Sequence, residues 1–288
     1  MKNVDVLGVR VERATKGLLV EELVGYLKSE RRWSVAKINA EFLVRSLNDD
    51  RFRAVLNGSD LNIADGVGVV WAARFLTLRT TSVTVLARAH VLWQALYSLS
   101  SLLLFPELCR FPITERLPGV DALYLMLEAA QRANASVYFL GASTEVNSKA
   151  RAQIQARFPH LKIAGGRDGY WTDDSAVVEQ IDRSQPGLLV VALGSPKQEY
   201  WISENLSRLG SVKVAVGEGG SLDFIAGEFR RAPRWMRDLG LEWFWRLFMN
   251  RSKTKTGSRP RRVWNAVPLF IYRVVAWKLT YGPTRVET

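Results

Sequence analysis

Short β-type runs alternate with helical patterns along most of this chain, and the alternation restricts its fold more than any other feature of the sequence. In the first part, the β-type runs lie at 4–12, 33–39 and 60–64, and helical patterns lie at 16–27, at 41–57 and from about Val67 onwards. Successive runs are too far apart for hairpins, and their spacing fits crossover connections between parallel strands. The pattern predicts an α/β fold with a largely parallel sheet.

A second series of the same kind follows the first. Its apolar runs lie at 136–141, 161–165, 187–194 and 213–217, and its helical patterns lie at 121–132, 145–157, 175–184 and 197–209. We expect two Rossmann-like parallel-sheet units, an N-terminal unit at 1–118 and a second, nucleotide-binding unit at 119–229.

Residues 77–116 break the alternation. They contain an apolar stretch, 91–105, that carries no formal charge. The stretch is shorter than the about 20 residues that a membrane-spanning helix needs. We interpret 77–116 as an insertion that forms an interfacial or partner-binding helix, and a helix packed into the core is an equal alternative.

The C-terminal segment is strongly basic. Residues 230–285 carry 14 Lys and Arg against two acids, which accounts for the whole net charge of +12. Tryptophans are interleaved with these cations, a mixture typical of a membrane interface. We expect a basic helical appendage at 230–288 that associates with an anionic membrane surface, and we expect a chain ending near Phe229 to fold without it.

The remaining composition narrows the chemistry. There is one cysteine, Cys109, and there are two histidines, His90 and His160, which excludes an internal disulfide and disfavours a Cys or His metal site. The glycine fingerprint of dinucleotide-binding enzymes is missing, and so is the Asp-x-Asp pair with which many sugar-nucleotide enzymes hold a metal. We expect no cofactor and no bound metal. The N-terminus lacks the apolar core of a signal peptide, so we expect the chain to stay in the cytoplasm.

Candidate ligand-binding residues follow the predicted strands, since ligands of open α/β sheets bind beyond the carboxyl ends of the strands. The exits contain Asn39 after the second run, Asp65-Gly66 after the third, and the stretches 194–199 and 217–223 after the last two. Each exit combines glycine with side chains that form hydrogen bonds. Taken singly, an Asp-Gly pair is more often a turn or a helix cap, and Gly219-Gly220 is more often a packing turn.

Eight sequence blocks in a fixed order resemble the WecG/TagA/CpsF family of glycosyltransferases. They are NAEFL (39–43), ADGVGVVWAARFL (64–76), LPGVDAL (117–123), VYFLGAS (137–143), GGRDGYW (165–171), LGSPKQEYW (193–201), GGSLDFIAGEFRRAP (219–233) and LEWFWRL (241–247). The resemblance covers about residues 4–248, apart from the inserted 77–116.

The resemblance implies an inverting, metal-independent transfer of N-acetylmannosamine or a related sugar from a UDP donor to an undecaprenyl-diphosphate-linked sugar. It implies that Asp65 is the catalytic base. The donor-binding candidates are Lys37, Asn39, Gly141, Gly194, Lys197, Gln198, Glu199 and Asp223. Within this set, Lys197 would face phosphate, and Gln198 or Glu199 would read uracil or ribose. The candidates for the acceptor diphosphate are Arg230, Arg231, Arg234, Arg237 and Arg246, although Arg246 could equally form a structural ion pair with Glu242.

The sequence departs from the family pattern at three places. Lys37 stands where the family usually has threonine, which leaves the donor sugar open. Glu218 stands where a small apolar residue is usual, and a buried carboxylate there would need a partner. The appendage is also longer than usual, with the apolar run 263–275 as a candidate membrane anchor.

Two other classes of protein are compatible with parts of this sequence. A basic nucleic-acid-binding protein with a non-catalytic α/β domain would account for the tail, but tryptophans beside long aliphatic stretches favour lipid over nucleic acid. A sugar-nucleotide epimerase would normally show the missing nicotinamide fingerprint. We therefore expect a peripheral glycosyltransferase on the cytoplasmic face of the membrane, with a UDP-sugar and a polyprenyl-linked acceptor as partners and no nucleic acid. A homo-oligomer is compatible with the sequence.

Overall fold

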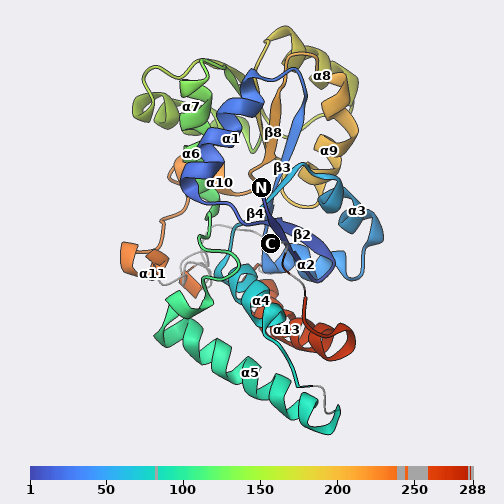
Figure 1. Cartoon of the computed structure of the whole chain (residues 1–288). Helices are drawn as coiled ribbons and strands as arrows, with labels where there is room; N and C mark the ends of the chain where they lie inside the picture. Colours follow the sequence, from blue (N-terminus) through green and yellow to red (C-terminus); the bar gives the residue numbers. More distant parts are fainter. Residues whose placement is uncertain (82–83, 239–243, 246–258, 285, 287–288) are drawn as a thin grey trace.

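A computed structural model of the chain describes residues 1–81, 84–238, 244–245, 259–284 and 286 (Figure 1). Its centre is a six-stranded sheet in the order β4-β3-β8-β7-β5-β6, and every neighbouring pair is parallel. The strands are β3 (Trp33–Ile38), β4 (Leu61–Ala64), β5 (Val137–Gly141), β6 (Ile163–Arg167), β7 (Leu188–Ala192) and β8 (Val214–Gly217). The α/β class is confirmed. Strands from both predicted units join this one sheet, and β3 pairs with β8 where the two units meet.

Helices cover both faces of the sheet (Figure 1). One face carries α1 (Lys16–Lys28), α6 (Gly119–Arg132), α7 (Thr144–Arg157) and α10 (Ser221–Ile225). The other carries α2 (Ala40–Ser46), α3 (Asp50–Gly58), α8 (Asp174–Arg183) and α9 (Lys197–Asn205), which is followed by the short η2 (Leu206–Arg208). Because both faces are covered, a central strand such as β7 is buried at every position, which explains its unbroken apolar sequence.

The first predicted run, 4–12, is not a strand of the main sheet. It forms a separate antiparallel hairpin of β1 (Asn3–Val6) and β2 (Val9–Glu12). Leu7 and Gly8 both have positive φ, at 57° and 79°, as a two-residue hairpin turn requires. Gly8 also donates its backbone N–H to Asp5 Oδ1 at 3.0 Å. A single glycine was the only sign of this turn in the sequence, so the interpretation of 4–12 as one continuous run was wrong.

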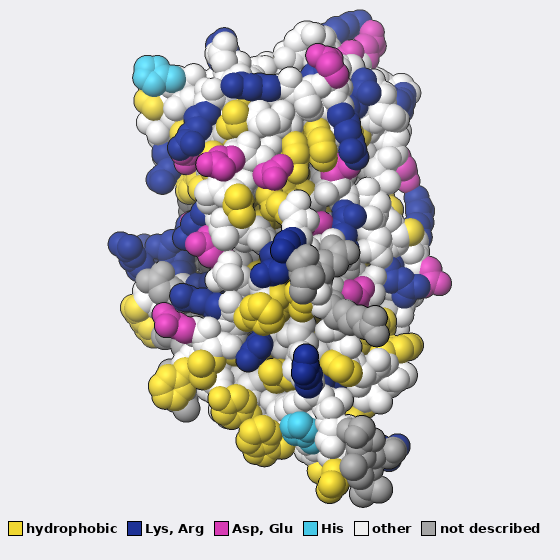
Figure 2. Space-filling view, viewed as in Figure 1, with side chains coloured by type: hydrophobic (Ala, Val, Ile, Leu, Met, Phe, Trp, Pro, Cys, Tyr) yellow, Lys and Arg dark blue, Asp and Glu magenta, His cyan; other side chains and the backbone are white. Residues whose placement is uncertain are grey.

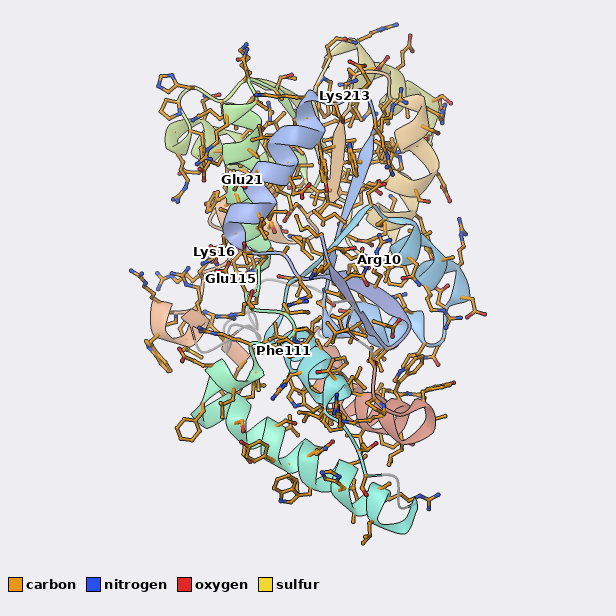
Figure 3. The ribbon with its side chains drawn as sticks, viewed as in Figure 1. Arg10, Lys16, Glu21, Phe111, Glu115 and Lys213 are labelled. Atoms are coloured by element: carbon orange, nitrogen blue, oxygen red, sulfur yellow. The ribbon has the colours of Figure 1, made fainter. Side chains whose placement is uncertain are left out.

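Residues 77–116 form a long helix beyond the sheet. α4 (Val67–Thr77) leads away from β4, and α5 (Thr84–Leu104) and η1 (Pro106–Cys109) lie at the end of the molecule away from α7 and α8 (Figure 1). The chain then returns to the sheet, where Glu115 Oε2 accepts the Lys16 backbone N–H at 2.8 Å (Figure 3). No helix among the described residues is both long enough and apolar enough to span a membrane.

The C-terminal segment contributes buried side chains to the core. Its described helices are α11 (Arg234–Asp238) and α13 (Arg259–Tyr281). Phe270 and Val274 of α13 are buried in one cluster with side chains of α2, α4 and α5. Lys278 is also buried, and its Nζ donates to Gln94 Oε1 of α5 at 2.8 Å and to the Phe75 carbonyl of α4. A chain ending near Phe229 would leave this cluster uncovered, so these contacts argue against the expectation that such a chain folds.

The burial of Lys278 predicts a pH-dependent stability. Burial lowers the pKa of Lys278 from its ordinary 10.5 to about 7, and the charge of Arg74 adds to the effect. Between these two values the unfolded chain holds a proton on Lys278 that the folded chain has lost, so the free energy of unfolding rises with pH there. Below about pH 7 both states hold this proton, and the group adds no pH dependence. We expect urea unfolding to show this rise between about pH 7 and about pH 9, and we expect Lys278→Met to flatten it. The same slope in both proteins would contradict this account.

Candidate active site

Three neighbouring strands bring their carboxyl ends together at the candidate site. β4 is followed by Asp65, β3 ends with Lys37 and Ile38 before Asn39, and β8 is followed by Glu218. The site thus forms at the carboxyl ends of these parallel strands, where ligands of such folds bind. Asn39 is the N-cap of α2, and its side-chain oxygen accepts the Phe42 N–H at 3.0 Å. Asn39 therefore has a structural role, and its contact with the donor stays a prediction.

Asp65 is held by its backbone and does not cap a helix. Its N–H donates to the Ile38 carbonyl at 2.9 Å, and the neighbouring Ala64 carbonyl accepts the Leu117 N–H at 2.8 Å. The N-cap of α4 is Gly66, and no side chain caps that helix. The alternative that Asp65 is a helix cap is therefore wrong. The second contact also brings the start of α6 close to Asp65.

Polar groups from three elements converge next to Gly119, the first residue of α6. A methyl group in place of the Gly119 hydrogen would lie 3.3 Å from Lys37 Nζ, 3.3 Å from Ser221 Oγ and 3.7 Å from Asp65 Oδ1. The Lys37 amine, the Ser221 hydroxyl and the Asp65 carboxylate thus surround one point beyond the carboxyl ends of the strands. Ser221 lies in the predicted exit 217–223, whereas the only signal for Gly119 in the sequence is the block LPGVDAL.

Lys37 and Glu218 form a buried ion pair beside Asp65. Lys37 is 7% exposed and Glu218 is 1% exposed. Lys37 Nζ contacts Glu218 Oε2 and donates to the Gly119 carbonyl at 3.3 Å. Burial raises the pKa of Glu218, the charge of Lys37 opposes this effect, and the charge of Asp65 adds to it. Lys37 is therefore the partner that a buried Glu218 needs.

Gln198 ties the loop after β7 to the loop after β8. Its Oε1 accepts the backbone N–H groups of Gly194 at 3.1 Å and Gly219 at 2.9 Å. Its Nε2 donates to Glu199 Oε1 at 2.7 Å. Both side chains are buried, and burial raises the pKa of Glu199. These contacts give Gln198 and Glu199 a role in shaping the site, and their contact with uracil or ribose stays a prediction.

A crevice for a nucleotide is expected between β5 and β7, because α7 and α9 leave these strands towards opposite faces of the sheet. Glycine is required at this point. Gly141 has a φ of +113°, and a side chain on it would lie 2.4 Å from the Ala192 carbonyl. Gly194 has a φ of +78°. Lys197 is exposed in the first turn of α9, with its Nζ 5.2 Å from the centre of the Trp171 ring.

Of the arginines predicted to bind the acceptor, two form hydrogen bonds within the protein and two are exposed to solvent. Arg231 makes two hydrogen bonds with Asp121, of 2.8 and 3.1 Å. Burial of Asp121 works to raise its pKa, but Arg231 overcomes this effect and holds the pKa below its ordinary value. Arg237 donates to the Ala232 carbonyl at 3.1 Å, whereas Arg230 and Arg234 are exposed. Their contact with a diphosphate stays a prediction.

Two further residues were predicted to bind the donor or the acceptor, Asp223 and Arg246. Asp223 is half-buried in α10, and Arg246 lies outside the described residues. Across the part of the chain that the structure describes, no three His, Cys, Asp or Glu side chains form a group that could hold a metal ion.

Comparison with known proteins identifies relatives over nearly the whole chain. The model of the glycosyl transferase WecG/TagA/CpsF family matches residues 4–98 and 99–283. An N-acetylglucosaminyldiphosphoundecaprenol N-acetyl-beta-D-mannosaminyltransferase of Bacillus subtilis is 31% identical over 216 residues, which are 75% of this chain and 71% of the relative. The protein of the same name from Staphylococcus aureus is 27% identical over 277 residues, which are 96% of this chain and 93% of the relative.

The buried ion pair predicts a strong coupling between Lys37 and Glu218. Lys37→Met leaves a buried carboxylate without its cation, and Glu218→Leu leaves a buried amine without its anion. Each single change is expected to lower the free energy of unfolding by about 3–5 kcal/mol. The double variant replaces both charges with apolar groups of similar volume, so we expect it to be more stable than either single variant. Additive losses in a double-mutant cycle of urea unfolding would exclude the coupling.

Proposed function

The chain belongs to the WecG/TagA/CpsF family of glycosyl transferases, and on this premise we propose that it moves N-acetylmannosamine or a related sugar from a UDP donor to a sugar linked to undecaprenyl diphosphate. The names of the relatives support the sugar and the acceptor. The structural observation that carries the proposal is the position of Asp65, whose carboxylate lies beside Lys37 and Ser221 at the carboxyl edge of the sheet.

Asp65 is the proposed catalytic base. It takes the proton from the acceptor hydroxyl as the hydroxyl oxygen attacks the anomeric carbon of the donor sugar. A new bond forms between the anomeric carbon and the acceptor oxygen, the bond to the UDP oxygen breaks, and UDP leaves with the bonding electron pair. Attack from the side opposite to UDP inverts the anomeric configuration.

We place the nucleotide of the donor in the crevice between β5 and β7. Gly194 has open space beside its backbone there, Gly141 allows the backbone to approach the Ala192 carbonyl closely, and Lys197 is the first residue of α9, which follows the loop after β7. Cations of the protein would stabilise the charge on the departing diphosphate, with Lys197, Arg230 and Arg234 as exposed candidates. The reaction is then independent of a metal ion.

The proposed place of the reaction is the cytoplasmic face of the cell membrane, where a polyprenyl-linked acceptor is held by its lipid. The basic C-terminal segment supports peripheral association, because each Lys or Arg near an anionic surface contributes up to about 1 kcal/mol. The transfer would be one step in the synthesis of a cell-surface polysaccharide or a teichoic-acid-type polymer.

The role of Asp65 is tested by Asp65→Asn, which keeps the size of the side chain and removes the base. We expect kcat to fall by about 10²- to 10⁴-fold, the usual effect of losing a general base, with an unchanged melting temperature. The matched control is Asp50→Asn, since Asp50 is an exposed residue of α3. UDP release with a short-chain lipid-diphosphate acceptor is the measurement. Turnover of Asp65→Asn close to that of Asp50→Asn would remove Asp65 from the mechanism.

Metal independence is tested with a chelator. We expect the rate of UDP release to be unchanged in EDTA, because Lys197 and the exposed arginines of the C-terminal segment would take the role that a divalent ion has in other sugar-nucleotide enzymes. A loss of activity that Mg²⁺ or Mn²⁺ restores would refute this part of the proposal.

A further inference from the structure

Helix α5 exposes large apolar side chains while it buries polar ones. The side chains facing solvent include Leu92, Trp93, Leu96 and Tyr97, whereas Gln94, Ser98 and Ser101 are buried beside the apolar Val91 and Ala95. A surface helix of a protein in water normally exposes its polar side chains. The apolar outer face therefore indicates that this side of α5 meets an apolar environment.

Specific contacts fix the orientation of α5, so the exposed face is set by the fold. Ser98 Oγ accepts the indole N–H of Trp71 in α4 at 2.9 Å. Gln94 Nε2 donates to the Arg79 carbonyl at 2.7 Å, and Gln94 Oε1 accepts from Lys278 of α13 at 2.8 Å. A rotation of the helix that buried Leu92 and Leu96 would break these bonds and leave buried polar groups unpaired.

The exposed apolar face is large and contains aromatic residues. Leu96 is 68% exposed and Trp93 is 59% exposed, and the rings of Trp93 and Tyr97 are stacked with centroids 5.4 Å apart. Figure 2 shows apolar side chains gathered along the edge of the molecule that α5 forms. Further exposed members lie at both ends of the helix and beyond it, namely Leu86, Phe105, Leu108 and Phe111. Exposed apolar surfaces of this kind mark sites of protein or membrane contact.

The charges around α5 favour lipid over a protein partner. Residues 66–106 contain no Asp or Glu, and their charged residues are Arg74, Arg79 and Arg88. Trp and Tyr rings on an apolar helix face, with arginine beside them, are the features of a helix that lies in the plane of a membrane interface. A cationic helix without acids also suits an anionic lipid surface better than a second copy of this basic chain.

We propose that the exposed face of α5 inserts into the headgroup boundary of the lipid bilayer and docks the enzyme on the membrane. The choice of lipid rests on the proposed function, since the proposed acceptor is itself a membrane lipid. The docking surface consists of Leu92, Trp93, Leu96 and Tyr97, with Leu86 and Phe105 at its ends. Basic residues of the C-terminal segment would add attraction to anionic lipid, whereas α5 supplies the apolar contact that salt does not screen.

Vesicle co-sedimentation of the full chain tests the proposal. The probes are phosphatidylcholine vesicles with and without phosphatidylglycerol, in about 1 M NaCl, where charges are screened beyond about 3 Å. We expect Trp93→Ser with Leu96→Ser to lower partitioning at least about tenfold. The matched control, Leu18→Ser with Tyr170→Ser, removes two exposed apolar side chains elsewhere and should partition like the unmodified chain. Equal partitioning of both double variants would overturn the proposal.

A fluorescent label separates lipid from a second copy of the chain. Cys109→Ser removes the single cysteine, and Leu96→Cys then carries a bimane group on the outer face of α5. We expect its emission to shift to shorter wavelength only when vesicles are added. A shifted emission without vesicles, together with a dimer in sedimentation velocity, would show that a second copy covers the face and would overturn the proposal.

Activity on a water-soluble acceptor separates this inference from the proposed function. The Trp93→Ser, Leu96→Ser variant should keep its rate on a short-chain acceptor and lose rate on acceptor held in vesicles. Equal loss on both acceptors would overturn the docking role. Absence of transfer by the unmodified chain on the soluble acceptor, with vesicle binding intact, would instead refute the proposed function and leave the docking surface in place.

Discussion

The buried ion pair between Lys37 and Glu218 joins the two halves of the sheet at the candidate site, and the geometry around Asp65 depends on it. In the parallel pairing of β3 with β8, Val35 lies opposite Val216, so Lys37 and Glu218 come at equivalent positions two residues further on. The pair also contacts the start of α6 through the Gly119 carbonyl. Loss of either charge would leave the other buried without compensation, next to the carboxylate proposed as the base.

The sequence predicted most of the individual elements, because each has its own local pattern. It predicted the longer helices around the sheet, but not the short α10, and it predicted the polar exits of the strands. It did not predict the hairpin at the N-terminus, where one glycine marks the turn, nor the pairing of β3 with β8, since these strands are far apart in the chain. The contact between Lys37 and Glu218 was missed for the same reason. Sequence showed that each residue was unusual, but only the sheet register shows that they are partners.

The region beyond the sheet was predicted less well, since its structure depends on tertiary contacts. The sequence suggested two opposed interpretations of the apolar stretch in α5, a core helix and an interfacial one. The structure shows that α5 buries polar as well as apolar side chains and exposes an apolar face, a distinction that hydropathy alone does not make. It also places α13 against α4 and α5 through buried Phe270, Val274 and Lys278. Helices α4, α5 and α13 thus pack together at one end of the molecule.

Glycosyl transfer itself is the central claim, and product analysis tests it most directly. Purified chain is incubated with UDP-N-acetylmannosamine and N-acetylglucosamine linked to a short-chain lipid diphosphate, and both products are measured in the same sample. The account predicts that UDP and a lipid-linked disaccharide with inverted anomeric configuration appear in equal amounts, and that little UDP forms without acceptor. UDP release that is independent of the acceptor, or a disaccharide with retained configuration, would contradict it.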